Sequence, residues 1–227
     1  MYLFDLQGHP QLESFPELLD TVSEVCNQIY EEMTREESLW IFAPAKSGSE
    51  YLPIGMAAAD IVKNQSPFVL KNVISRYHGG SDDRRGSDIV DSYEEILFFV
   101  KDKRKYYFNK DPIRVEHVYE GNEWNERDEG RSSYHDSTVR RYNPKGKDPG
   151  NVWLTEIRTE TSDETVDRIE PFPRKEAIQR CILAGSKENE LVTLINFGEK
   201  TTSLVEKLDR GVCTVSVEVL LGNENDV

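Results

Sequence analysis

The middle of the chain concentrates side chains that suit contact with a nucleic acid. Arginine pairs with phosphate or guanine through two parallel hydrogen bonds, and aromatic rings stack on unpaired bases. The cations are Arg127, Arg131, Arg140, Arg141, Lys145 and Lys147, and the aromatic residues among them are Trp124, Tyr134 and Tyr142. On composition alone, an ordinary solvated loop region explains these residues equally well.

The overall charge argues against general binding of polyanions. The 227 residues include 28 basic and 42 acidic side chains, and the net charge of −14 repels nucleic acid over roughly 8–10 Å in ordinary salt. Residues 101–147 are the exception, with 12 basic and 9 acidic side chains. Any contact with DNA therefore belongs in this middle segment.

A glycine followed by hydroxyl side chains suggests a second kind of chemistry. The run Gly198-Glu-Lys-Thr-Thr202 contains the residue types of a phosphate-binding loop. Its spacing differs from Gly-x4-Gly-Lys-Ser/Thr, because Gly198 and Lys200 are not adjacent and no glycine lies five residues before Gly198. The sequence therefore argues against a nucleoside triphosphatase.

Other common catalytic patterns are absent from the sequence. The four histidines are scattered, the cysteines at 26, 181 and 213 lack Cys-x-x-Cys spacing, and there is no Gly-x-Ser-x-Gly motif, so no metal and no hydrolase is expected. Three cysteines argue against a disulfide framework and favour a reducing cytoplasm. No apolar run approaches the roughly 18 residues of a membrane span, and the N-terminus lacks the basic stretch of a secretory signal.

Helices and buried strands are expected to alternate along most of the chain. Apolar residues at intervals of three and four predict helices, and continuous or alternating apolar runs predict strands. The expected helices cover 12–35, 53–64, 173–184 and 200–208, and the expected strands cover 39–43, 68–77, 93–101, 190–196 and 212–219. This alternation predicts one wound α/β domain over residues 1–227, with ligands at the carboxyl ends of its strands and an antiparallel edge hairpin. Residues 102–165 lack periodicity and are predicted to be an insertion of loops and short strands.

Several stretches carry a family resemblance that the order of the elements supports. They are Ser38-Leu-Trp-Ile-Phe-Ala43, Ser92-Tyr-Glu-Glu-Ile-Leu-Phe-Phe-Val-Lys101, Arg141-Tyr-Asn-Pro-Lys-Gly-Lys-Asp-Pro-Gly-Asn-Val-Trp153, Glu170-Pro-Phe-Pro-Arg-Lys175 and Arg180-Cys-Ile-Leu-Ala-Gly-Ser186. The chain resembles DNA methyltransferases of the amino-methylating kind, in the circular arrangement with the catalytic strand first, a target-recognition insertion next and the cofactor strand near the end.

This resemblance implies a function as well as a Rossmann-like wound sheet. It implies that S-adenosylmethionine is the methyl donor and that the substrate is N4 of cytosine or N6 of adenine in DNA, as in restriction-modification systems. The transfer would be direct and in line, with no covalent enzyme intermediate. It also makes 102–165 the target-recognition insertion, which favours DNA binding by the six cations named above.

The resemblance assigns a set of cofactor-binding residues. The family's cofactor strand ends in Asp-Pro-Phe-x-Gly-Ser-Gly-Thr-Thr, where glycine lets backbone N–H groups approach the ligand. This chain keeps Phe197, Gly198, Thr201 and Thr202 but has Ile195-Asn196 and Glu199-Lys200 in place of the other motif residues. Glu218 follows the next expected strand, where such folds place an acid on the ribose hydroxyls; chance placement is the open alternative.

The family's catalytic loop, Asp/Asn/Ser-Pro-Pro-aromatic, is absent, and no catalytic residue is assigned. The nearest run, Ser66-Pro67-Phe68, predicts a turn that opens a strand. The loop would lie upstream of the first helix, and the chain is expected to begin after it. One hypothesis is therefore an enzyme whose catalytic loop comes from a partner chain or has been lost by truncation. The others are a non-catalytic module that binds DNA or protein through 102–165, and a remnant that cannot fold because a sheet strand is unpaired.

Overall fold

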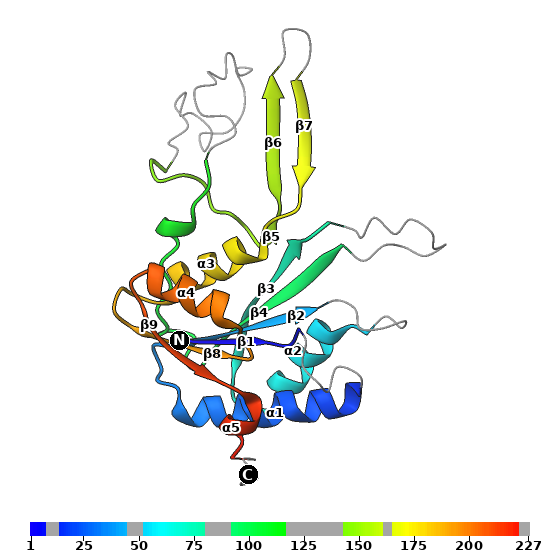
Figure 1. Cartoon of the computed structure of the whole chain (residues 1–227), viewed down its shortest axis with the longest axis vertical. Coiled ribbons are helices and arrows are strands. Elements are labelled where there is room, and N and C mark those ends of the chain that lie inside the picture. Colours follow the sequence, from blue (N-terminus) through cyan, green and yellow to red (C-terminus); the bar gives the residue numbers. More distant parts are fainter. Residues whose placement is uncertain (8–13, 45–51, 80–91, 117–142, 161–164, 223–227) are drawn as a thin grey trace, which may run out of the picture.

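The computed structural model describes residues 1–7, 14–44, 52–79, 92–116, 143–160 and 165–222 (Figure 1). The strands are β1 (Tyr2–Asp5), β2 (Ser38–Pro44), β3 (Val69–Tyr77), β4 (Tyr93–Val100), β5 (Val152–Trp153), β6 (Thr155–Glu160), β7 (Thr165–Glu170), β8 (Leu191–Ile195) and β9 (Gly211–Val215). The helices are α1 (Phe15–Glu32), α2 (Ile54–Gln65), α3 (Arg174–Gly185), α4 (Glu199–Lys207) and α5 (Val217–Leu220), with a short 3-10 turn at Asp111–Ile113.

Seven of the described strands form one sheet in the order β5-β3-β4-β2-β1-β8-β9. Every neighbouring pair is parallel except the two pairs that β4 makes with β2 and β3. The predicted wound α/β sheet with an antiparallel hairpin is therefore confirmed. The second strand of the hairpin, β4, lies inside the sheet, while β3 is followed at the edge only by the two residues of β5.

The first strand, upstream of the first helix, lies inside this sheet between β2 and β8, where the sequence analysis expected no strand of the chain. Tyr2–Asp5 pair with Leu39–Phe42 of β2, and Tyr2–Phe4 pair with Thr193–Ile195 of β8. The segment between this strand and α1 belongs to the chain, and the hypothesis of an unpaired sheet strand is wrong. Four residues are too few to establish a hydrophobic period, so the sequence pattern did not reveal this strand.

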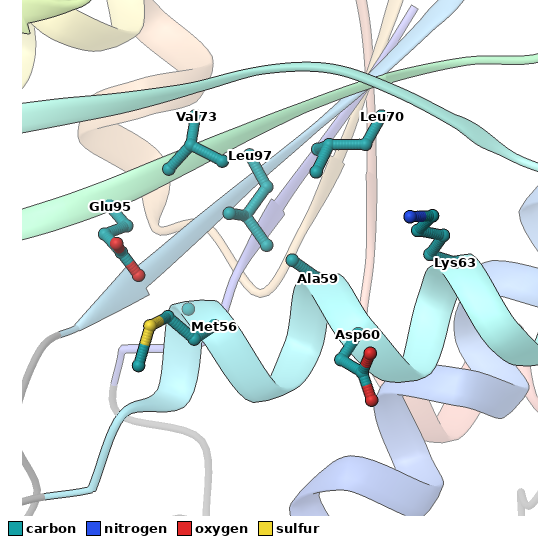
Figure 2. A pocket seen from close by; sticks show the side chains of 9 residues that line it. Met56, Ala59, Asp60, Lys63, Leu70, Val73, Glu95 and Leu97 are labelled. Atoms are coloured by element: carbon teal, nitrogen blue, oxygen red, sulfur yellow. The ribbon is translucent and has the colours of Figure 1, made fainter.

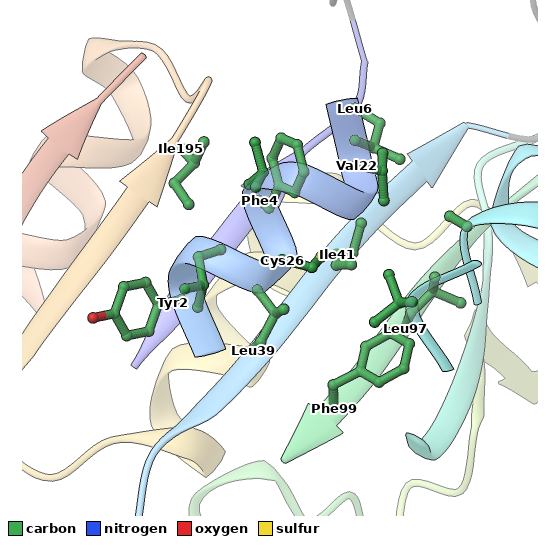
Figure 3. Packing of buried hydrophobic residues seen from close by; sticks show 14 of the residues in the cluster. Tyr2, Phe4, Leu6, Val22, Cys26, Leu39, Ile41, Leu97, Phe99 and Ile195 are labelled. Atoms are coloured by element: carbon green, nitrogen blue, oxygen red, sulfur yellow. The ribbon is translucent and has the colours of Figure 1, made fainter. Parts of the chain in front are cut away.

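Helices cover both faces of the sheet, and this explains why β2 is apolar throughout. Leu39 and Ile41 face α1 and α2 in the core that Figure 3 shows. Trp40 and Phe42 face the opposite way, into the core under α3 and α4. A parallel strand buried on both faces needs apolar side chains at every position.

The end of the sheet differs from the sequence prediction at β9. The expected strand ran to residue 219 because valines alternate from 215 to 219, whereas the strand ends at Val215. The Ser216 hydroxyl accepts a hydrogen bond from the Val219 N–H at 3.3 Å and caps the short helix α5. A serine N-cap therefore outweighs the alternating pattern here.

The predicted insertion at 102–165 is divided between the body of the domain and a projection. The Tyr107 N–H donates to the Glu36 carbonyl at 2.7 Å and the Asn109 N–H to the Ala184 carbonyl at 2.8 Å, so this part packs on the body. The antiparallel pair β6–β7 extends away from the sheet in Figure 1. In the described part of the chain, no helix is long and apolar enough to span a membrane, and no group of three metal-binding side chains was found.

Candidate functional site

The parallel strands β1, β2 and β8 end at the same edge of the sheet, where ligands bind in folds of this kind. Because β4 is antiparallel, its first residues lie at this edge as well. Four charged side chains meet here: Asp5 from β1, Arg76 from β3, Glu94 from β4 and Arg174 from the start of α3. We call these four residues the carboxyl-edge cluster.

Acidic and basic groups alternate through the cluster. Arg174 donates two hydrogen bonds to Asp5, from Nη1 to Oδ2 at 3.0 Å and from Nη2 to Oδ1 at 2.6 Å. Its Nε lies 3.5 Å from Glu94 Oε2 and has no hydrogen-bond partner among the described residues. Arg76 donates to Glu94 at 2.6 Å and to the Phe172 carbonyl at 2.6 Å. Two cations therefore balance two carboxylates.

Burial makes this pairing necessary, because the side chains of Asp5 and Glu94 are only 7% and 6% exposed. Burial raises the pKa of the Asp5 carboxyl, and the hydrogen bonds from Arg174 oppose the rise. Burial also disfavours the charge of Arg174, but its hydrogen bonds and attraction to Asp5 and then to Glu94 raise its pKa overall. Any amine that approaches Asp5 must therefore compete with Arg174 for the carboxylate oxygens.

The sequence analysis did not identify Asp5 as a site residue. This residue ends β1 and precedes Leu6-Gln7, upstream of the first helix. The Gln7 N–H donates to Asp5 Oδ1 at 2.9 Å, and the Leu6 N–H donates to the Phe42 carbonyl at 2.9 Å. An acid directly after the apolar run at the start of the chain was the available signal. Asp5-Leu6-Gln7 thus follows a sheet strand upstream of the first helix and lacks the two prolines of the family's catalytic loop.

The predicted cofactor residues follow β8 at the same edge. The ring of Phe197 meets the ring of Phe42 edge to face, with 5.7 Å between centroids. Gly198 is the N-cap of α4, and among the described residues no side chain caps this helix and no atom lies within 4 Å of a Cβ placed at Gly198. Uncapped N–H groups beside open space form a site suited to a carboxylate.

The other three predicted cofactor residues lie further along the chain, in α4 and α5. The Thr201 N–H donates to the Gly198 carbonyl at 2.9 Å within the first turn of α4. The Thr202 hydroxyl lies 3.3 Å from the Thr214 hydroxyl of β9. Glu218 is exposed in α5, just beyond the end of β9. The structure therefore brings Phe197 and Gly198 to the edge, and roles for Thr201, Thr202 and Glu218 stay predictions.

The predicted DNA contacts are described only in part. Arg127, Arg131, Arg140 and Arg141 lie outside the described residues. Lys145 donates to Asp111 at 2.5 Å, and Lys147 lies 4.0 Å from Glu156. The hydrogen bond from Lys145, followed by that from Arg114, lowers the pKa of Asp111. Both lysines therefore have acidic neighbours that a phosphate would have to replace.

A hollow of about 270 Å³ lies on the other face of the sheet, between α2 and the β3–β4 hairpin (Figure 2). Glu95 points from β4 toward the start of α2, beside Met56. Gly55 permits this approach, since a Cβ there would lie 1.9 Å from Glu95 Oε2. Among the described residues Glu95 has no hydrogen bond or ion pair, and burial raises the pKa of its carboxyl.

We expect Glu95→Gln to stabilise the protein at neutral pH. Because the folded state raises the pKa of Glu95 above its unfolded value, ionisation costs stability as pH rises through the interval between the two values. The variant should unfold at a higher temperature than wild type at pH 7, and the difference should vanish at about pH 4 and below. Thermal unfolding followed by circular dichroism measures this, with the exposed Glu188→Gln as the control. An advantage that persists unchanged at low pH would contradict the explanation.

Comparison with known proteins gives one family and one curated relative. The profile of a family described as DNA methylase matches residues 7–211. The type II methyltransferase M.ScaI of Streptomyces caespitosus is 27% identical over 183 residues, which are 78% of this chain and 54% of that protein. The chain therefore spans about half the length of this relative.

Solved structures share the fold at low sequence identity. PvuII DNA methyltransferase, described as cytosine-N4-specific, is 10% identical with a TM-score of 0.61, and the match covers 100% of this chain and 80% of that one. The crystal structure of the M1.HpyAVI–SAM complex is 15% identical with a TM-score of 0.53, covering 99% of this chain and 88% of that one. These similarities establish a shared architecture.

Proposed function

The chain belongs to the DNA methylase family, and from this premise we propose that it methylates DNA. The donor is S-adenosylmethionine, and the acceptor is the exocyclic amine of cytosine (N4) or adenine (N6) within a specific sequence. The observation that carries the proposal is the arrangement at the carboxyl edge. The uncapped start of α4 at Gly198 follows β8, and Asp5 ends the neighbouring parallel strand β1.

The residues present fit S-adenosylmethionine. Its carboxylate suits the N–H groups at the start of α4, and the open space at Gly198 admits it. When bound, S-adenosylmethionine supplies the methyl group as an electrophile. Phe197, whose ring packs edge to face on the buried ring of Phe42, directly precedes Gly198, and Glu218 provides an acid beyond the end of the next strand. Glu199, in the first turn of α4, departs from the family's pattern and repels a carboxylate.

The base would be held on the β1 side of this space. Transfer needs an acceptor that orients the amine, and Asp5 is the acid at the strand end. Because Arg174 binds both Asp5 oxygens, we infer that one of these bonds opens when an amine binds. A partner chain need not supply the loop position, since it follows β1, although a partner that adds an aromatic stacking residue remains compatible with the proposal.

Recognition of DNA is assigned to the insertion, residues 102–165, within a single domain. Arg127, Arg131, Arg140, Arg141, Lys145 and Lys147 are the proposed contacts, and each lost phosphate contact should lower the salt slope by about one unit. We also propose the cytoplasm as the compartment, because none of the three cysteines forms a disulfide.

Two measurements on the purified chain test the function. Calorimetric titration with S-adenosylmethionine should show saturable binding at about 10 μM or tighter. Transfer of a labelled methyl group to unmethylated genomic DNA should follow, and digestion to nucleosides identifies the methylated base. Binding without transfer would favour the non-catalytic DNA- or protein-binding module, and no binding by a folded sample would refute the proposal.

A further inference from the structure

A second pocket lies on the α3 face of the sheet, away from the carboxyl edge. Its volume is about 340 Å³, within the range of small-molecule sites. Trp40, on its floor, lies four residues before the end of β2, and Arg180, on its wall, lies six residues beyond Arg174 on α3. Six residues of helix correspond to roughly 9 Å, so the pocket is separate from the carboxyl-edge cluster. We call it the aromatic pocket.

Five aromatic residues contribute to its lining: Trp40, Phe98, Tyr106, Phe108 and Trp153. Phe98 stacks on Trp40 with 4.1 Å between centroids and planes 11° apart, and Phe108 stacks on Phe98 at 5.6 Å. Tyr106 meets Phe98 edge to face at 5.8 Å. Phe108 remains 36% exposed, which leaves an aromatic face open to a ligand. A stacked set of rings that ends in an exposed ring suits a planar aromatic ligand.

The pocket also holds a cation, Arg180, that forms no ion pair with the described residues. The Arg180 guanidinium lies 4.3 Å from the centre of the Phe172 ring and 5.4 Å from that of Trp153. Among the described residues it makes no hydrogen bond or ion pair, and burial lowers its pKa while Glu176, one turn earlier, acts in the opposite direction. Because arginine stays charged, its fork of donors is available to a phosphate.

The other charged residues in the pocket leave its net charge positive. Lys71 Nζ lies 5.0 Å from the centre of the Tyr106 ring and has no acidic partner among the described residues. Lys110 and Asp148 form an ion pair at the rim, so they cancel each other. The side-chain amide of Asn151 donates to the Val73 carbonyl at 3.1 Å, and its oxygen can accept from a base edge.

We propose that the aromatic pocket binds one nucleotide. Its base stacks on the exposed ring of Phe108, and its phosphate pairs with Arg180 and Lys71. The shared chemistry is an aromatic base that carries a phosphate, and the source is either a free mononucleotide or a nucleotide of an unpaired DNA strand. The site goes beyond the proposed function, since it lies apart from the space at Gly198.

Tryptophan fluorescence provides a direct test, because Trp40 and Trp153 both line the pocket. Adenosine monophosphate should quench the emission saturably, with a Kd between about 10 μM and 1 mM. Adenosine, which lacks the phosphate, should bind at least tenfold more weakly. Arg180→Gln should weaken binding of the monophosphate at least tenfold and should reduce the difference between the two ligands, because Lys71 is then the only remaining proposed partner of the phosphate. The matched control is Lys175→Gln, an exposed cation on the same helix, which should bind like wild type.

Further arms identify the source and can overturn the proposal. Tighter binding of a single-stranded oligonucleotide than of the monophosphate, with a duplex much weaker, points to an unpaired DNA strand; the reverse order points to a free nucleotide. Circular dichroism checks that Arg180→Gln is folded. No saturable quenching, equal binding of adenosine and its monophosphate, or loss of monophosphate binding in Gly198→Leu would each refute a nucleotide site in this pocket.

Discussion

Replacing Arg174 with methionine should lower the free energy of unfolding by about 3 kcal/mol at pH 7. Removing one partner of a buried ion pair leaves an uncompensated charge, which costs about 3–5 kcal/mol, and the lower end applies because Arg76 still pairs with Glu94. For a chain of this length the melting temperature should fall by roughly 6–12 °C. Chemical unfolding at a series of pH values measures the effect.

The loss should depend on pH in a defined direction. Without Arg174, the folded state raises the pKa of Asp5 further above its unfolded value of about 3.9, because among the described residues only the Gln7 N–H remains as a hydrogen-bond donor. The variant is therefore least impaired below about pH 4, where the carboxyl is protonated in both states, and its deficit grows as pH rises through the raised value.

Two further variants decide whether the pair is the cause. Lys175→Met removes the neighbouring exposed cation and should change stability by less than about 0.5 kcal/mol. Adding Asp5→Asn to Arg174→Met should recover a large part of the loss, because no buried charge is then left unpaired. If Arg174→Met were as stable as wild type at pH 7, the carboxyl-edge cluster would not hold this part of the fold together.

The ion pair between Asp5 and Arg174 could not be predicted from the sequence. Its partners are 169 residues apart, on β1 and α3, so no local pattern connects them. The strand β2, in contrast, was predictable because burial on both faces made its sequence apolar throughout. The type of an element was thus predictable where a periodic or continuous apolar pattern extends over several residues.

The candidate site was predictable only where a backbone requirement leaves a recognisable residue. Gly198 was predicted because Phe197-Gly198 resembles the family's cofactor motif, in which glycine lets backbone N–H groups approach the ligand, and the structure places it at the start of α4 beside open space. Asp5 was missed because its strand has only four residues and because its ion pair with Arg174, which also lies beside Glu94, joins residues far apart in the sequence. The aromatic pocket was missed for a related reason, since Trp40, Phe98 and Arg180 come from three elements.

The substitution with the largest expected effect on ligand binding is Gly198→Leu. A side chain at this position enters the open space before α4 and displaces the carboxylate that the helix N–H groups would hold. The affinity for S-adenosylmethionine should fall by roughly 100-fold or more, a loss of about 2.7 kcal/mol in binding free energy. Calorimetric titration of the variant and the wild-type chain measures it.

Folding should change little, which is what makes this variant informative. Gly198 has φ −84° and ψ 171°, a conformation open to any residue, and no neighbour obstructs a Cβ. The poorer N-cap costs at most about 1 kcal/mol. Gly211→Ala is the control, because a Cβ there makes ordinary contacts, the nearest at 3.6 Å. Gly211 begins β9 and therefore lies at the end of this strand that is away from the carboxyl edge. Unchanged affinity in Gly198→Leu would mean that the start of α4 does not hold the methyl donor, and the assignment of Phe197 and Gly198 would fail with it.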